Sequence, residues 1–280
     1  MATKSLVRSA SYQLPIPEFF TRLTKSRMND LWWPNYQELA STALDWRKKH
    51  SIKSPALDQV KVALVGIDQQ LTFIHPQAQL PVSGAVEDSI RFCEFLYRNL
   101  AVISQVVMTM DTHTAWQIFH QIFLVDDKGN HPNPHTLVLD AEIKAGKWRI
   151  APEVAYAVFG DANKYPALVQ YLSHYSKELA ASAAKYPLIT WPFHAMLGGI
   201  DHALVPAIHE AVLFHSIARG RRTQFEIKGG QPLSEAYSPY GEEVQKDHNG
   251  KPVGQKNTAM FELLSKFEAN GQLKLHHPNS

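Results

Sequence analysis

The chain has 280 residues, of which 45% are hydrophobic and 19% are charged, a composition typical of a globular protein with one large domain or two small ones. Its 28 basic and 26 acidic residues give a formal net charge of +2, so nothing in the charge points to nucleic acid or an acidic membrane as a partner. Cys93 is the single cysteine, which excludes an intrachain disulfide. Without an apolar run as long as a signal peptide or a membrane span, we expect a cytoplasmic location and no membrane attachment.

Residues 1–55 are predicted to form an N-terminal helical extension. The segment from 35 to 50, NYQELASTALDWRKKH, has helical spacing and ends in basic residues, and prolines punctuate the chain on both sides of it. We expect this extension to pack on the main domain, residues 56–280, or on a neighbouring subunit. A homo-oligomer is therefore one expectation.

Two apolar runs with a helix between them predict an α/β fold. Residues 60–68 and 101–111 are nearly continuous apolar segments, as in strands that are buried on both faces of a parallel sheet. Between them, apolar residues recur at steps of three and four from Val86 to Leu100, which indicates an amphipathic helix. Strand, helix and strand in this order form a right-handed crossover.

The second half of the chain adds a long excursion and a third strand. Residues 120–186 are interpreted as an insertion, with a helix from about residue 165 onward. Residues 201–220 predict a further helix that ends at Gly220. Residues 223–230 alternate, with Phe225 and Ile227 on one face and polar residues on the other, which indicates a strand.

Charged residues stand at the carboxyl ends of these three predicted strands. They are Asp68, Asp111 and Lys228. One such residue usually marks only the point where a strand meets water, but three on one edge suggest a site, because ligands of open parallel sheets bind outside the carboxyl ends of the strands. A lysine between two carboxylates would favour their ionised forms.

A metal site is suggested by the stretch VVMTMDTHTAWQIFH, residues 106–120. Asp111 and His113 are two apart in extended chain, so their side chains point the same way, and carboxylate and imidazole are ordinary zinc ligands. The chain has 14 histidines, so this pair alone is a weak signal, and a polar strand end is the competing interpretation. Candidates for a third ligand are His120, His131, His135 and His194.

Five short motifs occur in an order that resembles the nicotinamidase/isochorismatase-like cysteine hydrolases. They are DQQLTF (68–73), MDTH (110–113), WPFHAMLGG (191–199), FEIKGG (225–230) and AYS (236–238). The resemblance covers about residues 60–260 and is greatest to a larger, nicotinamidase-related subgroup. It implies a Rossmann-like, three-layer α/β/α fold with a mostly parallel sheet. Leu71 and Thr72 depart from the pattern, because Asn and Asp are usual at these positions.

The resemblance also implies an activity and a role for each matching residue. The activity is hydrolysis of a small amide, such as nicotinamide, to an acid and ammonia. Asp68 would be the general base and Lys228 would tune it. Asp111, His113 and His194 would hold a divalent metal, commonly zinc, and no organic cofactor is implied. The substrate pocket would include Phe73, Trp191 and Tyr237. His120 would line the pocket or support the metal ligands from outside it, and an ordinary surface histidine is the alternative. Glu226 would either orient a metal-bound histidine or face solvent.

The cysteine nucleophile of that family has no counterpart at the expected place. It would follow a fourth strand, yet after the helical segment 257–271 only QLKLH, residues 272–276, is strand-like, and no cysteine follows it. Cys93 falls on the apolar face of the first helix and is interpreted as structural. We therefore expect a truncated or altered family member with an incomplete sheet. A catalytically inactive metal- or ligand-binding homologue and a metal-water hydrolase on the same fold are the alternatives.

Overall fold

A parallel three-stranded sheet forms the centre of the fold. The computed structural model describes residues 13–21, 27–28, 30–181, 186–254 and 256–268. In this part of the chain, β1 (Ala63–Gly66), β2 (Gln105–Asp111) and β7 (Gln224–Lys228) pair in the order β1-β2-β7. All three run parallel, so their carboxyl ends lie at one edge of the sheet. The predicted α/β fold with a parallel sheet is thereby confirmed.

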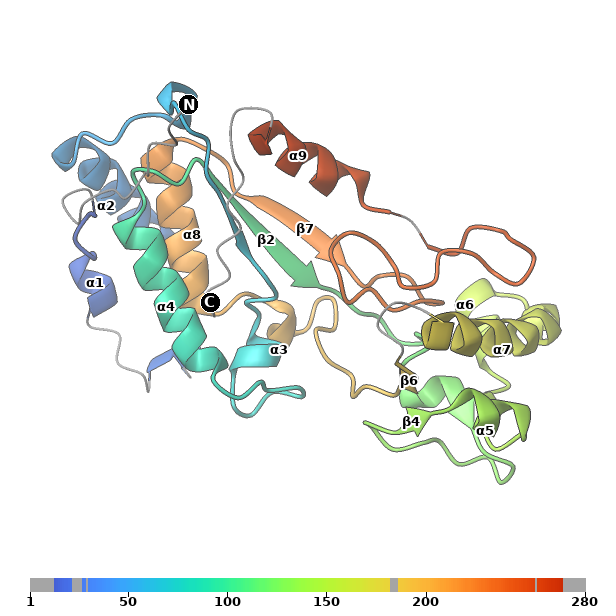
Figure 1. Ribbon diagram of the computed structural model, residues 1–280. Helices are drawn as coiled ribbons and strands as arrows, with labels where there is room; N and C mark the ends of the chain where they lie inside the picture. The colour runs from blue at the N-terminus through green and yellow to red at the C-terminus, as the bar shows by residue number, and fades with distance from the viewer. Residues whose placement is uncertain (1–12, 22–26, 29, 182–185, 255, 269–280) are drawn as a thin grey trace.

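Two long helices cover one face of the sheet (Figure 1). They are α4 (Ala85–Arg98) and α8 (Pro206–Arg219), and α2 (Tyr36–Lys49) packs outside α8. Alternate residues of β2, Val106, Met108 and Met110, point into the hydrophobic core between sheet and helices. Gly220 ends α8 with a φ of +68°, a left-handed conformation that glycine adopts without strain.

Helix α9 (Thr258–Glu268) covers the other face, which completes three layers (Figure 1). Its residues Met260 and Leu264 pack against Val107 of β2. Phe225 and Ile227 of β7 share a face, as the alternation predicted, but both are exposed because β7 lies at the edge of the described sheet. The strand-like residues 272–276 lie outside the described part of the chain.

The N-terminal extension packs on the helical side of the sheet. It contains α1 (Glu18–Thr21) and α2, whose first turn is capped by the Asn35 side chain, followed by a 3₁₀ turn at Pro55–Leu57. Arg219, at the end of α8, is fully buried. It forms an ion pair with Asp58 and donates hydrogen bonds to the carbonyls of Lys53 and Ile103. These contacts fasten the segment that leads into β1.

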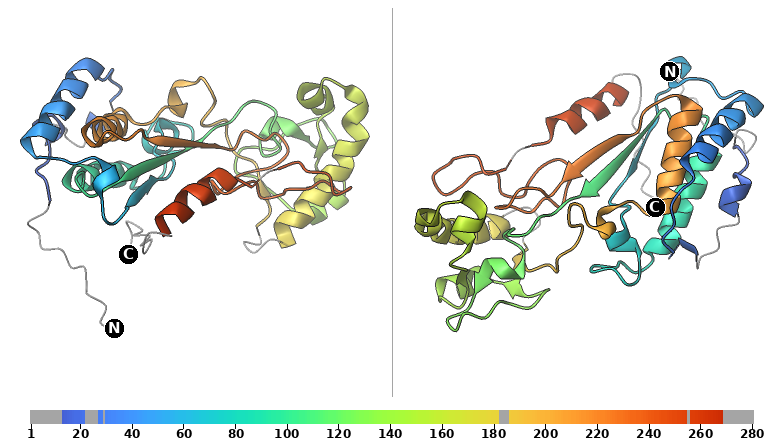
Figure 2. Two further views of the ribbon diagram at one scale, coloured as in Figure 1. Left: turned by 90° about the horizontal axis from the view of Figure 1, so that it is seen from above. Right: turned by 180° about the vertical axis from the view of Figure 1, so that it is seen from behind.

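The insertion builds a second hydrophobic core at the far end of the molecule from α1 and α2 (Figure 2). Two small antiparallel pairs, β3 (Leu124–Val125) with β5 (Arg149–Ile150) and β4 (Leu137–Val138) with β6 (Leu188–Ile189), lie beside the helices of this region. The helices are α5 (Asp140–Lys144), α6 (Val154–Phe159) and α7 (Tyr165–Ala181). Short turns of helix at α3 (Leu71–Ile74), Gln121–Phe123, Ala162–Lys164 and Ile200–His202 complete the described elements.

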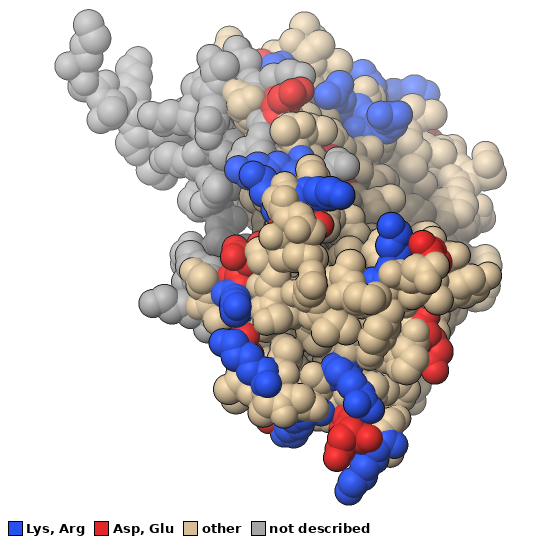
Figure 3. All heavy atoms as spheres, turned by 90° about the vertical axis from the view of Figure 1, so that its right-hand side faces the viewer, with Lys and Arg blue, Asp and Glu red and all other residues tan. Residues whose placement is uncertain are grey.

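Charges of both signs are mixed on the surface at this end of the molecule. Figure 3 shows Lys and Arg side chains beside Asp and Glu, with uncharged surface between them. On α5, for example, Lys144 pairs with Asp140, and Lys147, three residues after the helix, pairs with Glu142. None of the helices in the described part of the chain combines the length and apolar character needed to cross a bilayer.

Candidate active site

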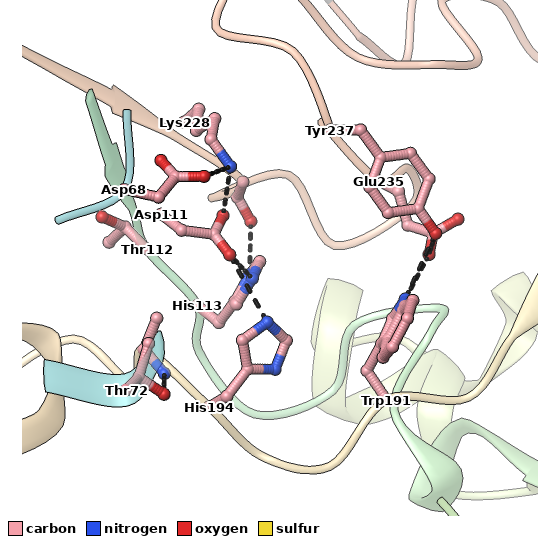
Figure 4. Close-up of polar contacts among 12 residues, drawn as sticks. Asp68, Thr72, Asp111, Thr112, His113, Trp191, His194, Lys228, Glu235 and Tyr237 are labelled. Atoms are coloured by element: carbon pink, nitrogen blue, oxygen red, sulfur yellow. Dashed lines mark hydrogen bonds and ion pairs between the residues drawn. The ribbon is translucent and has the colours of Figure 1, made fainter. Parts of the chain in front are cut away.

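The three charged residues at the strand ends meet in space. Lys228 Nζ lies 3.0 Å from Asp68 Oδ2 and 3.1 Å from Asp111 Oδ1, so one ammonium group bridges two carboxylates (Figure 4). The contact follows from the sheet register, which places Asp111 directly beside Lys228. The side chains of Lys228 and Asp111 are buried, and that of Asp68 is 22% exposed. Asp68 is thus the most accessible member of the group.

Neighbouring polar side chains hold both carboxylates in place. Asp68 has a φ of +50°, and its backbone N–H donates to Thr109 Oγ1, which in turn donates to Asp68 Oδ1 at 2.7 Å. Gln70 is fully buried, and its side chain forms two hydrogen bonds with the backbone of Asp111. It accepts from the N–H at 2.7 Å and donates to the carbonyl at 2.8 Å. The strained backbone of Asp68 is therefore held by contacts at the base of the site.

Asp111, His113 and His194 form a compact group of atoms that could hold a metal ion. One ligand atom from each of the three lies within 4.8 Å of the others, and all three residues are buried. His113 Nε2 is 2.9 Å and His194 Nε2 is 3.4 Å from the same oxygen, Asp111 Oδ2. Among the four histidines that the sequence left open as a third ligand, His194 is the one that the fold brings to this group.

The tautomers of both histidines fit a metal ion. His113 Nδ1 lies 3.1 Å from the Gly229 carbonyl, and His194 Nδ1 lies 2.8 Å from the Pro192 carbonyl. A carbonyl only accepts, so Nδ1 donates in each ring, and Nε2 is the atom that faces Asp111. Without a metal, a proton on Nε2 can join each ring to the Asp111 carboxylate; a divalent cation would take the place of these protons. Two nitrogens with one carboxylate oxygen suit zinc or a similar divalent ion.

The buried charges are matched to one another. Burial by itself would raise the pKa of Asp111, but hydrogen bonds from His113 and His194 and the charge of Lys228 lower that pKa far below its usual range. Burial by itself would lower the pKa of Lys228, but Asp111 and Asp68 outweigh it, and the pKa rises. The Asp111 carboxylate and the Lys228 ammonium are therefore charged at neutral pH.

Gly229 is required by the closeness of the backbone to the metal-binding atoms. Its φ is +84°, and a Cβ atom at this position would lie 2.7 Å from His113 Cε1 and 2.8 Å from Asp111 Oδ1. The neighbouring Gly230 has nothing within 4 Å of the equivalent point. Only the first of the two glycines in the KGG motif is therefore sterically necessary for the site.

A cavity of about 220 Å³ lies between the charged group and an aromatic wall. Phe73, Trp191 and Tyr237, which the resemblance assigned to the pocket, all line it. On the wall opposite His194 and Lys228, Trp191 and Tyr237 lie side by side (Figure 4). Phe119 and Glu235 also line the cavity, and the sequence had singled out neither. The space is sufficient for a ligand with a single ring.

His120 differs from its predicted place. It does not line this cavity but lies buried between the rings of Phe119 and Phe193, with ring centroids 4.8 and 4.5 Å away, and neither ring nitrogen has a hydrogen-bond partner among the described residues. Burial, together with His113 and His194, lowers its pKa to about 3. His120 therefore contributes a neutral, space-filling ring behind the site.

Two other residues that the sequence singled out, Glu226 and Thr72, form their hydrogen bonds away from the cavity. Glu226 receives a hydrogen bond from Asn257 and does not orient a histidine, because backbone carbonyls already hold both histidine rings. Thr72, one of the two departures from the family pattern, is fully buried and accepts a hydrogen bond from the Ala195 N–H, which supports the loop after His194. Thr72 therefore supports the loop that follows His194 and does not line the cavity.

Cys93 is a structural residue, as the sequence predicted. It lies on α4 in the main hydrophobic core, is fully buried, and its Sγ is 3.6 Å from the Ala207 carbonyl. Burial, reinforced by Glu210 and Glu94, raises the pKa of its thiol. Cys93 is not among the residues that line the cavity.

Comparisons with known proteins find similarity at the level of structure alone. No family model and no curated protein matches the chain. A structure of yeast nicotinamidase bound to the inhibitor nicotinaldehyde aligns over 74% of this chain and 70% of its own, with 16% identity and a TM-score of 0.43. A nicotinamidase/pyrazinamidase from Acinetobacter baumanii aligns over 75% and 66%, with 16% identity and a TM-score of 0.39. At these values, a function has to be argued from the site itself.

Proposed function

We propose that this chain carries the site of a nicotinamidase-like amidohydrolase, which binds a divalent metal and a small amide such as nicotinamide. One observation supports the proposal above all others. The donors of Asp111, His113 and His194 converge beside the Asp68–Lys228 ion pair, and both groups line one cavity with an aromatic wall. Metal-binding atoms, a base and a ring-sized pocket are the parts that hydrolysis of an aromatic amide requires.

Each polar residue has a role that follows from its surroundings. Asp111, His113 and His194 would hold the metal, which would act as a Lewis acid toward a ligand atom such as a pyridine nitrogen. Asp68 is the accessible carboxylate, and it would take the proton of the nucleophile and return it to the leaving nitrogen. Lys228 would keep the two carboxylates at fixed positions. The aromatic wall would stack against the ring of the substrate.

The nucleophile is the open part of the proposal. Hydrolysis adds water across the C–N bond of the amide, so that the acid receives the oxygen and ammonia leaves. Cys93 cannot attack a ligand in this cavity, because it is buried in the core beneath α8. The attacking group is then water or a thiol that is not part of the 280 residues. We expect no turnover by Cys93.

The same position of Cys93 favours a second candidate, a metal-dependent binding protein that does not hydrolyse its ligand. The two candidates differ in one product. In both cases the protein requires zinc and binds nicotinamide, but only the hydrolase converts it and releases ammonia. A hydrolase that uses water would release ammonia after thiol blockade and would stop when a chelator removes the metal.

The first test measures metal content of the purified protein by elemental analysis. We expect about one zinc or similar ion per chain, lost in Asp111→Asn and His194→Ala. His131→Ala is the matched control, because His131 lies in the insertion against the Leu124 carbonyl. A folded protein that binds no metal, or a His194→Ala variant that retains it, would contradict the proposed site.

The second test measures nicotinamide binding by calorimetry and ammonia release by a coupled assay, both on zinc-loaded protein. We expect binding that disappears with chelator. If ammonia is released, Asp68→Asn should reduce the rate by about two orders of magnitude or more, since it removes the base. Asp126→Asn, in an exposed turn, is the control. If zinc-free protein binds nicotinamide with unchanged affinity, the proposal that nicotinamide binds at the metal held by Asp111, His113 and His194 is refuted.

A further inference from the structure

A buried carboxylate lies in the pocket wall away from the metal-binding atoms. Glu235 is 3% exposed, yet it lines the cavity. No lysine or arginine of the described residues forms an ion pair with it. Burial raises its pKa to about 7, although hydrogen bonds from neutral groups partly offset this effect. Burial of a carboxyl group without a neighbouring cation destabilises the fold. The hydrogen bonds that Glu235 accepts therefore indicate what it contributes to the site.

Glu235 holds the two aromatic residues of the wall through one oxygen. Tyr237 donates its hydroxyl to Oε1 at 2.6 Å, and Trp191 donates its indole N–H to the same oxygen at 3.1 Å. The indole N–H also lies 3.2 Å from the Tyr237 hydroxyl, so the three groups form a closed triangle (Figure 4). Trp191 and Tyr237 come from different segments, and Glu235 sets the angle between them.

The second oxygen of Glu235 connects the wall to the insertion. Tyr175 of α7 donates its hydroxyl to Oε2 at 3.0 Å and is fully buried. One turn earlier on the same helix, Tyr171 donates to the Leu233 carbonyl at 2.8 Å. Two tyrosines of α7 thus hold the loop, but only Tyr175 reaches the carboxylate.

We propose that Glu235 is a positioning residue that fixes Trp191 and Tyr237 for ligand binding and connects this aromatic wall to helix α7. Three neutral donors point at one side chain, and a carboxylate can accept from all of them. A glutamine could accept from Trp191 and Tyr237 with its oxygen and donate its amide to the Tyr175 hydroxyl. A leucine can do neither: the hydroxyls of Tyr175 and Tyr237 would lose their acceptor, and the Trp191 indole N–H would keep only the Tyr237 hydroxyl.

The test combines a ligand-free and a ligand-bound measurement on the full chain, the second of which rests on the proposed function. The first is the indole N–H signal of Trp191 in ¹H–¹⁵N NMR spectra, assigned with Trp191→Phe. The second is the affinity of zinc-loaded protein for nicotinamide. The variants are Glu235→Leu, Glu235→Gln and Tyr175→Phe. Tyr171→Phe is the matched control, because it removes a similar hydrogen bond from the same helix to the same loop.

We expect Glu235→Leu to shift the Trp191 signal and to weaken nicotinamide binding about tenfold or more, with zinc content unchanged. Glu235→Gln should restore most of the affinity, and Tyr175→Phe should weaken it more than Tyr171→Phe does. An unshifted Trp191 signal in Glu235→Leu, or equal effects of the two tyrosine variants, would overturn the proposal. Wild-type protein that binds no nicotinamide would count against the proposed function alone, because the NMR signal still tests the contact.

Discussion

Replacement of Gly229 by alanine should damage the metal site without removing a ligand. Two effects combine at this position. An L-residue at a φ of +84° costs about 1–2 kcal/mol. The new Cβ would also lie 2.7 Å from His113 Cε1 and 2.8 Å from Asp111 Oδ1, so both metal-binding side chains must move. A metal site has to be held to within about 0.5 Å of its working geometry.

The expected loss of zinc affinity in Gly229→Ala is about ten- to a hundredfold, the range found when groups that orient metal ligands are disturbed. Chelator competition measures this affinity. Thermal unfolding of the metal-free protein measures the strain, which should lower the melting temperature by about 2–8 °C.

Two other glycines of the chain separate the two effects. Gly198 also has a φ of +84°, but nothing lies within 4 Å of its Cβ position, so Gly198→Ala should lower stability and leave zinc affinity almost unchanged. Gly230 has neither the positive φ nor a neighbour, so Gly230→Ala should change neither quantity. If Gly229→Ala binds zinc as tightly as Gly230→Ala, then Asp111 and His113 do not both lie against the backbone of Gly229.

Two predictions concern buried charge. Lys228→Met leaves Asp111 and Asp68 facing each other without their cation, which should cost about 3–5 kcal/mol of stability in urea unfolding. The low pKa of Asp111 stabilises the wild-type fold above pH 3.8, and this contribution is lost as pH falls further. Without Lys228 the pKa of Asp111 is lowered less, so in Lys228→Met the loss below pH 3.8 should be smaller and should be complete at a higher pH; identical profiles would contradict the bridge. His215 is buried, and burial lowers its pKa to about 4, so the unfolded chain binds more protons between pH 4 and 6.5. Through His215 alone, stability should therefore fall by on the order of 2 kcal/mol from pH 7 to 5, and the low pKa of His120 adds to the same slope. His215→Phe should reduce the slope by that contribution, since Arg219 still donates to the Ile103 carbonyl, and an unchanged slope would assign it to other groups.

The sequence predicted those parts of the site that depend on regular structure. In a parallel sheet the carboxyl ends of the strands share one edge, so Asp68, Asp111 and Lys228 could be placed together from strand patterns alone. His194 follows a strand of only two residues in a long excursion, and no periodicity relates it to Asp111. It was found through the resemblance of the WPFH motif, which the convergence of the three donors now supports geometrically.

Other parts of the site carry no pattern that sequence could reveal. Glu235 is a single acid in a loop, and its contacts come from α7, sixty residues earlier, and from Trp191. The resemblance placed His120 in the pocket, but its ring packs against Phe119 and Phe193 and does not line the cavity. The one available hint was the tyrosine two residues after Glu235 in SEAYS, and its meaning depends on tertiary contacts.

The two sides of the cavity belong to separate hydrophobic cores. The strand that carries Asp111 is packed by the main core, whereas Phe119 and Trp191 are packed by the core of the insertion. Proteins open locally in units of this kind, each with its own free energy. Fluctuation of the smaller unit would admit and release a ligand while the metal-binding group stays assembled. Over evolutionary time, substitutions in the insertion can likewise alter which ligand fits without disturbing the chemistry on the sheet.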